Sequence, residues 1–316
     1  MDGNARCDLV LGGGGVRGAA HIGALTALEE AGYSVVRSAG ASAGAIASAF
    51  AVAGVPATTL RELFEALDLT RFVFADVVAR LRTRRGVGRL ADRWSDEAAE
   101  PLTWLTEILA DQGIHTFGDL KVADPDATDP PERSYRLVVR CLDIMQRRVV
   151  RLPWDYARYG LDPDAQSVAQ AVRASMSVPL VYDPVRIGGE GRTGLLIDGG
   201  LTSGFPVTVL DRQDGALPRW PTFGIRLLPR APANGEVPDG GLALARMVMD
   251  ALLDAGDLLE PLTDCDEHRT VRIDLSETSQ LDLSSEQDEV FADGHATMAR
   301  FLADWDFDTY LAGCRS

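Results

Sequence analysis

The N-terminal part of the chain alternates between short apolar runs and amphipathic stretches, with glycines at the junctions. Cys7–Leu11 is an apolar run typical of a buried strand, and it leads directly into Gly12–Gly15. A helical stripe of apolar positions covers 20–31, and Tyr33–Arg37 is a second predicted strand. A helix of small residues follows over Ala45–Ala53. This order of strand, glycine turn, helix, strand, tight turn and helix predicts a mostly parallel α/β sheet.

The pattern beyond residue 58 predicts further elements of both kinds. The segment 58–112 is helical with mixed polarity, and we expect it to form a helical lid or insertion. Further strands are predicted at 135–141, 147–152, 195–197 and 222–228, and helices at 167–175, 242–259 and 284–305. Because the chain has no internal repeat and no long linker, we expect one domain over 1–316.

Composition and charge exclude some classes of protein. The chain has 316 residues, of which 46% are apolar and 25% charged, as in an ordinary globular protein. Its formal net charge of -16 argues against a nucleic-acid partner, since such proteins present a basic face to phosphates. The segment 78–93 is an exception, because valines and leucines alternate there with arginines. They are Arg80, Arg82, Arg84, Arg85, Arg89 and Arg93.

Two interpretations of this basic segment stay open. It fits a peripheral contact with lipid phosphates, and it also fits a solvated helix that pairs with the many carboxylates of the chain. We expect no signal peptide in residues 1–11, which lack a long apolar run, and the longest apolar stretch, 45–56, is too short to span a bilayer. Four separated cysteines (Cys7, Cys141, Cys265 and Cys314) form no CxxC, so we expect neither a disulfide framework nor a zinc site. A cytoplasmic protein with at most peripheral membrane contact is therefore predicted.

The first chemical motif is Gly40-Ala41-Ser42-Ala43-Gly44, a G-x-S-x-G placed between a predicted strand and a predicted helix. In this setting the motif forms a nucleophile elbow, in which the serine lies on a strained turn that only small neighbours permit. An ordinary turn with Ser42 as the helix N-cap is the alternative.

The second motif is the glycine-rich run 12–18. Backbone N–H groups at Gly13, Gly14 and Gly15 can converge on one point, as in an oxyanion hole. Gly13-x-Gly15-x-x-Gly18 after a strand also fits a dinucleotide fingerprint, and Arg37 would then accept the phosphate of NADP. An NADP-binding oxidoreductase is thus a second hypothesis.

The third motif is Asp198-Gly199-Gly200, which follows an apolar strand. A carboxylate at the end of a strand, with glycines beside it, can accept the proton of a serine hydroxyl. The alternative is a plain Asp-Gly turn.

Together these motifs resemble the patatin-like phospholipase family. The four blocks of that family match Gly13–Gly18, Gly40–Gly44, Ala174–Pro179 (A-S-M-S-V-P) and Asp198–Gly200 in order and spacing. The resemblance implies a three-layer α/β/α fold and a Ser42–Asp198 dyad, with oxyanion donors from Gly13, Gly14 and Gly15. Arg17 would steady that loop or bind an anionic head group. It implies a phospholipid or other acyl-lipid substrate without a cofactor or metal, and it leaves the oligomeric state open.

A Ser-His-Asp triad of the α/β-hydrolase type is a further alternative. The chain has four histidines (His21, His115, His268 and His295), and His268 or His295 would complete the order Ser, Asp, His. However, only two predicted strands precede Ser42, and His295 lies within an amphipathic pattern. We therefore expect a dyad that cleaves esters, which are easier acyl donors than amides, through an acyl-enzyme.

Overall fold

A computed structural model describes most of the chain. The described residues are 5–66, 99–122, 130, 133–179, 182–189, 191–202, 207–228, 240, 244, 247–248, 251–252, 262–275 and 287–315. The basic segment 78–93 and the middle of the predicted lid lie outside them. So does most of the predicted helix 242–259, although residues 244, 247–248 and 251–252 are helical.

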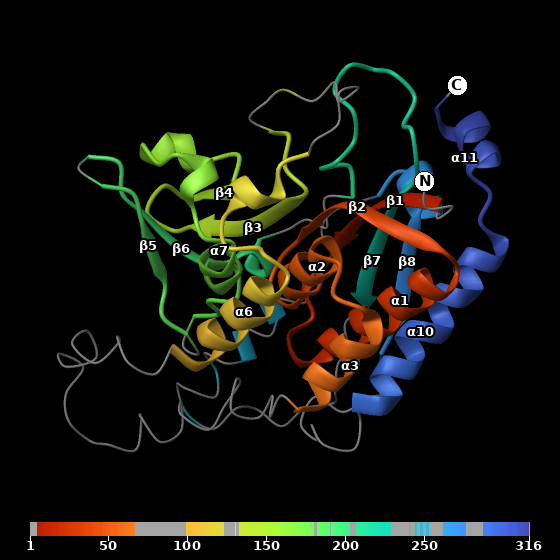
Figure 1. Cartoon of the computed structure of the whole chain (residues 1–316), viewed down its shortest axis with the longest axis horizontal. Helices are drawn as coiled ribbons and strands as arrows, with labels where there is room; N and C mark the ends of the chain where they lie inside the picture. Colours follow the sequence, from red (N-terminus) through yellow and green to blue (C-terminus); the bar gives the residue numbers. More distant parts are fainter. Residues whose placement is uncertain are drawn as a thin grey trace.

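The described strands form one eight-stranded sheet with the order β5-β6-β3-β2-β1-β7-β8, while β4 pairs with β3 (Figure 1). Their bounds are β1 (Ala5–Leu11), β2 (Tyr33–Gly40), β3 (Leu137–Asp143), β4 (Arg148–Leu152), β5 (Val185–Ile187), β6 (Gly194–Asp198), β7 (Thr222–Leu228) and β8 (Thr270–Asp274). All six strands that the apolar runs predicted are confirmed. The pattern missed β5 and β8, which are short and carry charged residues within them.

The sheet has a parallel part and an antiparallel part. Neighbours from β3 through β2, β1 and β7 to β8 run parallel. β6 runs antiparallel to β3, and β5 antiparallel to β6. The predicted mixed α/β fold, with a mostly parallel central sheet and flanking helices, is confirmed.

The longer helices pack against this sheet and against one another. Their bounds are α1 (Ala19–Glu30), α2 (Ala43–Ala53), α3 (Ala57–Ala66), α6 (Ala99–Asp111), α7 (Val168–Ser175), α9 (Asp264–His268), α10 (Gln287–Asp304) and α11 (Phe307–Cys314). α1 lies along α10, and α2 packs on β1 and β2 (Figure 1). The helices predicted at 167–175 and 284–305 are thus confirmed as α7 and α10. No helix in the described part of the chain is long and apolar enough to cross a bilayer.

Alternate residues of the parallel strands supply two apolar clusters. Leu9, Leu11 and Val139 belong to the large core beneath the helices. Val10 and Ala39 point to the opposite face of the sheet, where they pack against residues of the turn 207–210. β1 and β7 are buried over most of their length on both faces, and their sequences are accordingly mostly apolar.

The expectation for the cysteines needs a correction. Cys265 and Cys314 form a disulfide that joins α9 to α11, whereas Cys7 and Cys141 are free and buried. The two partners are 49 residues apart and carry no spacing motif, so only the tertiary structure brings them together. Since disulfides are uncommon in reducing compartments, this disulfide gives no support to the predicted cytoplasmic location.

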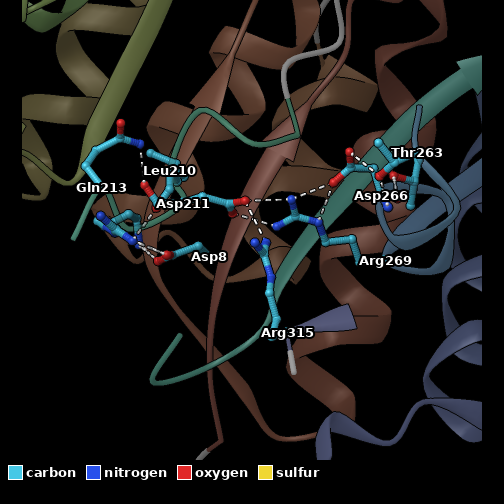
Figure 2. A network of polar contacts seen from close by, with 10 residues as sticks. Asp8, Leu210, Asp211, Gln213, Thr263, Asp266, Arg269 and Arg315 are labelled. Carbon is cyan, nitrogen blue, oxygen red and sulfur yellow. Dashed lines mark hydrogen bonds and ion pairs between the residues drawn. The ribbon is translucent and has the colours of Figure 1, made fainter. Parts of the chain in front are cut away.

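An arginine-carboxylate network includes Asp266 and Arg315, which directly follow the two disulfide cysteines, and Arg269, which directly precedes β8 (Figure 2). Arg269 donates to Asp211 at 2.6 and 2.8 Å and to Asp266 at 2.7 Å. Arg315 donates to the same Asp211 at 2.7 Å. Asp8 accepts a bond of 2.6 Å from Arg37. A cavity of about 120 Å³ opens here and is lined by the ion pairs Arg37–Asp8 and Arg315–Asp211, but it lies at the opposite end of the parallel strands from Ser42.

Candidate active site

Ser42 lies on a strained turn between β2 and α2. Its φ of 55° and ψ of -127° are unfavourable for a residue with a side chain. The turn is also tightly packed, because a Cβ at Gly44 would lie 2.3 Å from the carbonyl oxygen of Gly12, and one at Gly40 would lie 2.3 Å from that of Gly44. Both glycines of the G-x-S-x-G are therefore required, because neighbouring backbone atoms leave no room for a Cβ at either position. The predicted strand-turn-helix setting of Ser42 is confirmed.

The backbone of Ser42 is held by a residue from another element. Its N–H donates a 2.9 Å hydrogen bond to Oγ of Ser175, at the end of α7. The Ser175 hydroxyl in turn donates a 2.6 Å bond to the carbonyl oxygen of Arg140 in β3. Sequence reasoning assigned no role to Ser175, although the matched block A-S-M-S-V-P pointed to its position.

Asp198 is the last residue of β6, and it pairs with Cys141 in the middle of β3. Its N–H donates a 3.0 Å bond to the carbonyl oxygen of Ser177, two residues beyond Ser175. Its carboxyl Oδ1 accepts a 2.7 Å bond from the N–H of Gly200. The structure therefore holds Asp198 in one orientation at the edge of the turn that carries Gly199 and Gly200.

The carboxyl group of Asp198 is fully buried, and this changes its proton affinity. Burial raises the pKa of Asp198 to about 7, against the opposing effect of the hydrogen bond from the Gly200 N–H and of the nearby Ser42 hydroxyl. The Ser42 hydroxyl is near enough to influence this pKa but forms no hydrogen bond to the carboxyl group, since Oδ2 of Asp198 has no hydrogen-bond partner among the described residues. The two predicted residues are thus brought together, with a carboxyl group able to exchange a proton near neutral pH.

The glycine loop borders the same place. The N–H of Gly12 bonds to the carbonyl of Ile225, but within the described residues the N–H groups of Gly13, Gly14 and Gly15 have no acceptor. A Cβ at Gly13 would lie 3.9 Å from the Cα of Gly200, so the loop contacts the Asp-Gly-Gly turn. A cavity of about 20 Å³ lies where the three motifs meet, and its lining includes Gly12, Gly13, Gly40, Ala41, Gly199 and Gly200.

Two side chains fix the shape of this loop. Arg17 donates to the carbonyl of Gly14 at 3.4 Å and to that of Leu228 at 3.0 Å, which anchors the loop to the end of β7. Nε2 of His21 lies 2.9 Å from the carbonyl oxygen of Gly12. Because burial lowers the pKa of His21 to about 4, its ring is neutral and donates this bond. Of the two predicted roles for Arg17, the geometry supports the steadying of the loop.

The histidines of the alternative triad lie elsewhere. His268 precedes β8, and its ring lies edge-on to Trp305 and tilted against Tyr310, at the opposite end of the parallel strands from Ser42. His295 is on α10, where its Nε2 lies 2.7 Å from a carboxylate oxygen of Glu30. Neither contacts Asp198 or Ser42.

The residue that the NADP hypothesis requires is also engaged. Arg37 lies within β2 and donates to Asp8 at 2.6 Å and to the carbonyl of Leu210 at 2.8 Å. Its guanidinium group is therefore held inside the molecule, away from the end of β2 where a nucleotide phosphate would have to bind.

Comparison with known proteins decides the family. The family model described as patatin-like phospholipase matches residues 9–211, from the first strand past the Asp-Gly-Gly turn. The chain belongs to the patatin-like phospholipase family. The uncharacterized protein YqhO of Bacillus subtilis is 32% identical over 226 residues, covering 71% of this chain and 72% of YqhO. The uncharacterized NTE family protein Rv2565 of Mycobacterium tuberculosis is 30% identical over 206 residues, covering 64% of this chain but only 27% of its own length.

Solved structures support the same fold. ExoU of Pseudomonas aeruginosa, in its heterodimeric complex with SpcU, matches this patatin-like chain with a TM-score of 0.53 and 18% identity, over 95% of this chain and 52% of its own. VipD of Legionella pneumophila matches with a TM-score of 0.50 and 16% identity, over 95% and 67% of the two chains. At such low identity the likeness concerns the fold alone.

Proposed function

We propose that this patatin-like phospholipase chain hydrolyses fatty acyl esters of phospholipids or other acyl lipids. Ser42 is the nucleophile and Asp198 the general base, and the N–H groups of Gly13, Gly14 and Gly15 bind the oxyanion. No cofactor or metal takes part in the proposed reaction. The supporting observation is the fully buried Asp198 carboxyl group, which lies near enough to the Ser42 hydroxyl to be influenced by it and whose pKa of about 7 suits proton exchange with that hydroxyl.

The reaction proceeds in two halves. Oγ of Ser42 attacks the ester carbonyl while Asp198 takes the hydroxyl proton, and the oxyanion forms against the glycine loop. Collapse of this intermediate releases the alcohol, which receives the proton from Asp198 and leaves an acyl-enzyme on Ser42. Asp198 then takes a proton from water as it attacks the acyl group. Release of the fatty acid returns that proton to Oγ of Ser42.

Labelling with a fluorophosphonate probe tests this proposal. The expected result is one covalent adduct that peptide mapping places on Ser42, with no adduct after denaturation or in the Ser42→Ala variant. An adduct on another serine, or unchanged hydrolysis of a p-nitrophenyl ester by Ser42→Ala, would overturn the proposal. Saturable binding of NADP to the wild-type protein would instead favour the oxidoreductase hypothesis.

Several finer predictions belong to the same proposal. They are a single acyl hydrolase domain over 1–316, a lid within 58–112, and contact between Arg17 and a lipid head group. The cytoplasm remains the predicted location, with peripheral membrane contact through the basic segment 78–93. Replacing Arg82, Arg84 and Arg85 with Gln tests this contact. It should weaken binding to anionic vesicles and activity on them while sparing a small soluble ester.

A further inference from the structure

We propose that Ser175 is a positioning residue, which holds the backbone of Ser42 at its working distance from Asp198. This inference rests on the proposed function, because it concerns how the two reacting groups are kept together. Ser175 is fully buried, so substrate does not reach it. Its role is exerted through the hydrogen bond from the N–H of Ser42 to its Oγ.

The first argument concerns the strain at Ser42. A residue with φ of 55° persists only where its surroundings fix it. Ser42 is the residue before α2, so its N–H has no partner within that helix. The Ser175 hydroxyl accepts a hydrogen bond from this buried N–H and so satisfies it. Without this hydroxyl, the donor would lose its acceptor and the strained turn would lose a fixed point.

The second argument concerns the other end of the same contact. The Ser175 hydroxyl donates to the carbonyl oxygen of Arg140, which belongs to the strand between β2 and β6. Gly199 packs against that same oxygen so closely that a Cβ there would lie 2.2 Å from it. The carbonyl oxygen of Arg140 therefore contacts both Ser175, which holds Ser42, and Gly199, which follows Asp198.

The end of α7 makes a second connection of this kind. The carbonyl of Ser177 accepts the N–H of Asp198, and Arg173 donates a 2.6 Å bond to the Ser177 hydroxyl. One helix terminus thus supports Ser42 through a side chain and Asp198 through the backbone. Of the two bonds made directly to Ser42 and Asp198, only the one to Ser42 is accepted by a side-chain hydroxyl, that of Ser175, which mutation can remove.

This geometry predicts a separation of kinetic constants. Loss of the Ser175 hydroxyl shifts Ser42 relative to Asp198, and displacements of this kind lower the rate by up to about a hundredfold. KM for a small ester stays the same, since no binding group is removed. The acid limb of the pH profile stays near the pKa of Asp198, because burial of that carboxyl group is unchanged.

The test compares Ser175→Ala with a matched control, Ser38→Ala. Ser38 is equally buried and donates one hydroxyl bond of 2.8 Å to Ser48, but it does not contact Ser42. We expect kcat on a p-nitrophenyl ester and the rate of fluorophosphonate labelling to fall about 10- to 100-fold in Ser175→Ala and less than about twofold in Ser38→Ala. Ser175→Thr, which keeps the hydroxyl, should recover most of kcat.

Rates are measured below the melting transition and divided by the folded fraction from circular dichroism. A destabilised variant can then still be compared with the wild type. A Ser175→Ala variant with the kcat and labelling rate of Ser38→Ala would overturn the inference, as would Ser175→Thr with a kcat no higher than that of Ser175→Ala. These outcomes leave the proposed function intact as long as wild-type Ser42 is labelled. Failure of wild-type Ser42 to react would instead refute the proposed function itself.

Discussion

Asp198 accepts a 2.7 Å hydrogen bond at Oδ1 from the N–H of Gly200, two residues further along the chain. This bond fixes the carboxyl group while its other oxygen stays buried without a well-formed partner among the described residues. Burial raises the pKa of Asp198 to about 7. The carboxyl group of Asp198 thus differs from a surface aspartate in both orientation and proton affinity.

The first prediction concerns the pH dependence of activity. Asp198 must be ionised to accept the proton of Ser42, so kcat/KM should rise with pH, with an apparent pKa of about 7, and level off above it. Initial rates on a p-nitrophenyl ester across the pH range check this. A profile that is flat between pH values of about 5 and 8 would exclude Asp198 as the base, since an ordinary aspartate is already ionised there.

A second prediction concerns stability in Asp198→Asn. The pKa is raised in the folded state above the unfolded value of about 3.9, so the protonated group stabilises the fold fully below about pH 4. This contribution is lost as pH rises through about 7. The uncharged Asn lacks this loss, so the variant should gain stability over the wild type between mildly acidic and mildly alkaline pH, by up to a few kcal/mol. Urea unfolding at several pH values measures the difference, and turnover should be abolished at all of them. If the difference in unfolding free energy between Asp198→Asn and the wild type narrows as pH rises, the pKa of Asp198 is not raised by folding.

The strain at Ser42 leads to a third prediction. Ser42→Gly and Ser42→Ala both remove the nucleophile, so neither should hydrolyse esters. Glycine tolerates the φ of 55°, so Ser42→Gly should be more stable than Ser42→Ala by roughly 1 kcal/mol. Thermal melting of the two variants compares them directly. If Ser42→Ala melts at the higher temperature, the turn does not store the strain described for it.

The glycine loop offers a matched pair of variants for a fourth prediction. A Cβ at Gly14 would lie 2.5 Å from Cδ1 of Leu227, whereas one at Gly15 meets nothing within 4 Å. Gly14→Ala should therefore displace the oxyanion donors and lower kcat/KM on the order of a hundredfold. Gly15→Ala should mainly cost about 1 kcal/mol of stability, through its φ of +54°. If Gly14→Ala kept the same kcat/KM as Gly15→Ala, the glycine loop would have no part in the reaction.

The fifth prediction separates the dyad from a triad. His268→Ala and His295→Ala should keep kcat within about twofold of the wild type, because neither ring contacts Asp198 or Ser42. Removing the exposed contact between His295 and Glu30 should cost less than about 1 kcal/mol. Assays of both variants beside Asp198→Asn provide the comparison. Loss of activity in either histidine variant to the level of Asp198→Asn would require a histidine in the mechanism.

The sequence by itself determined the local geometry of the site. The apolar run at Cys7–Leu11 predicted β1, since a strand buried on both faces is mostly apolar. The glycines around Ser42 indicated a turn too tight for side chains, and a Cβ at Gly40 or Gly44 would indeed overlap backbone atoms. Such features depend on neighbours within a few residues, so a local pattern is enough to reveal them.

The tertiary structure alone decided how these local pieces meet. β2 runs parallel to β3 but β6 runs antiparallel to it, so the C-terminal ends of β2 and β6 point in opposite directions along the sheet. The two ends nevertheless meet, because β2 stops opposite Val139 and β6 stops opposite Cys141, only two residues away along β3. Strand direction and register arise from contacts between distant segments, and the same holds for the support of Ser42 by Ser175 and for the disulfide of Cys265 and Cys314. No pattern within one segment encodes them.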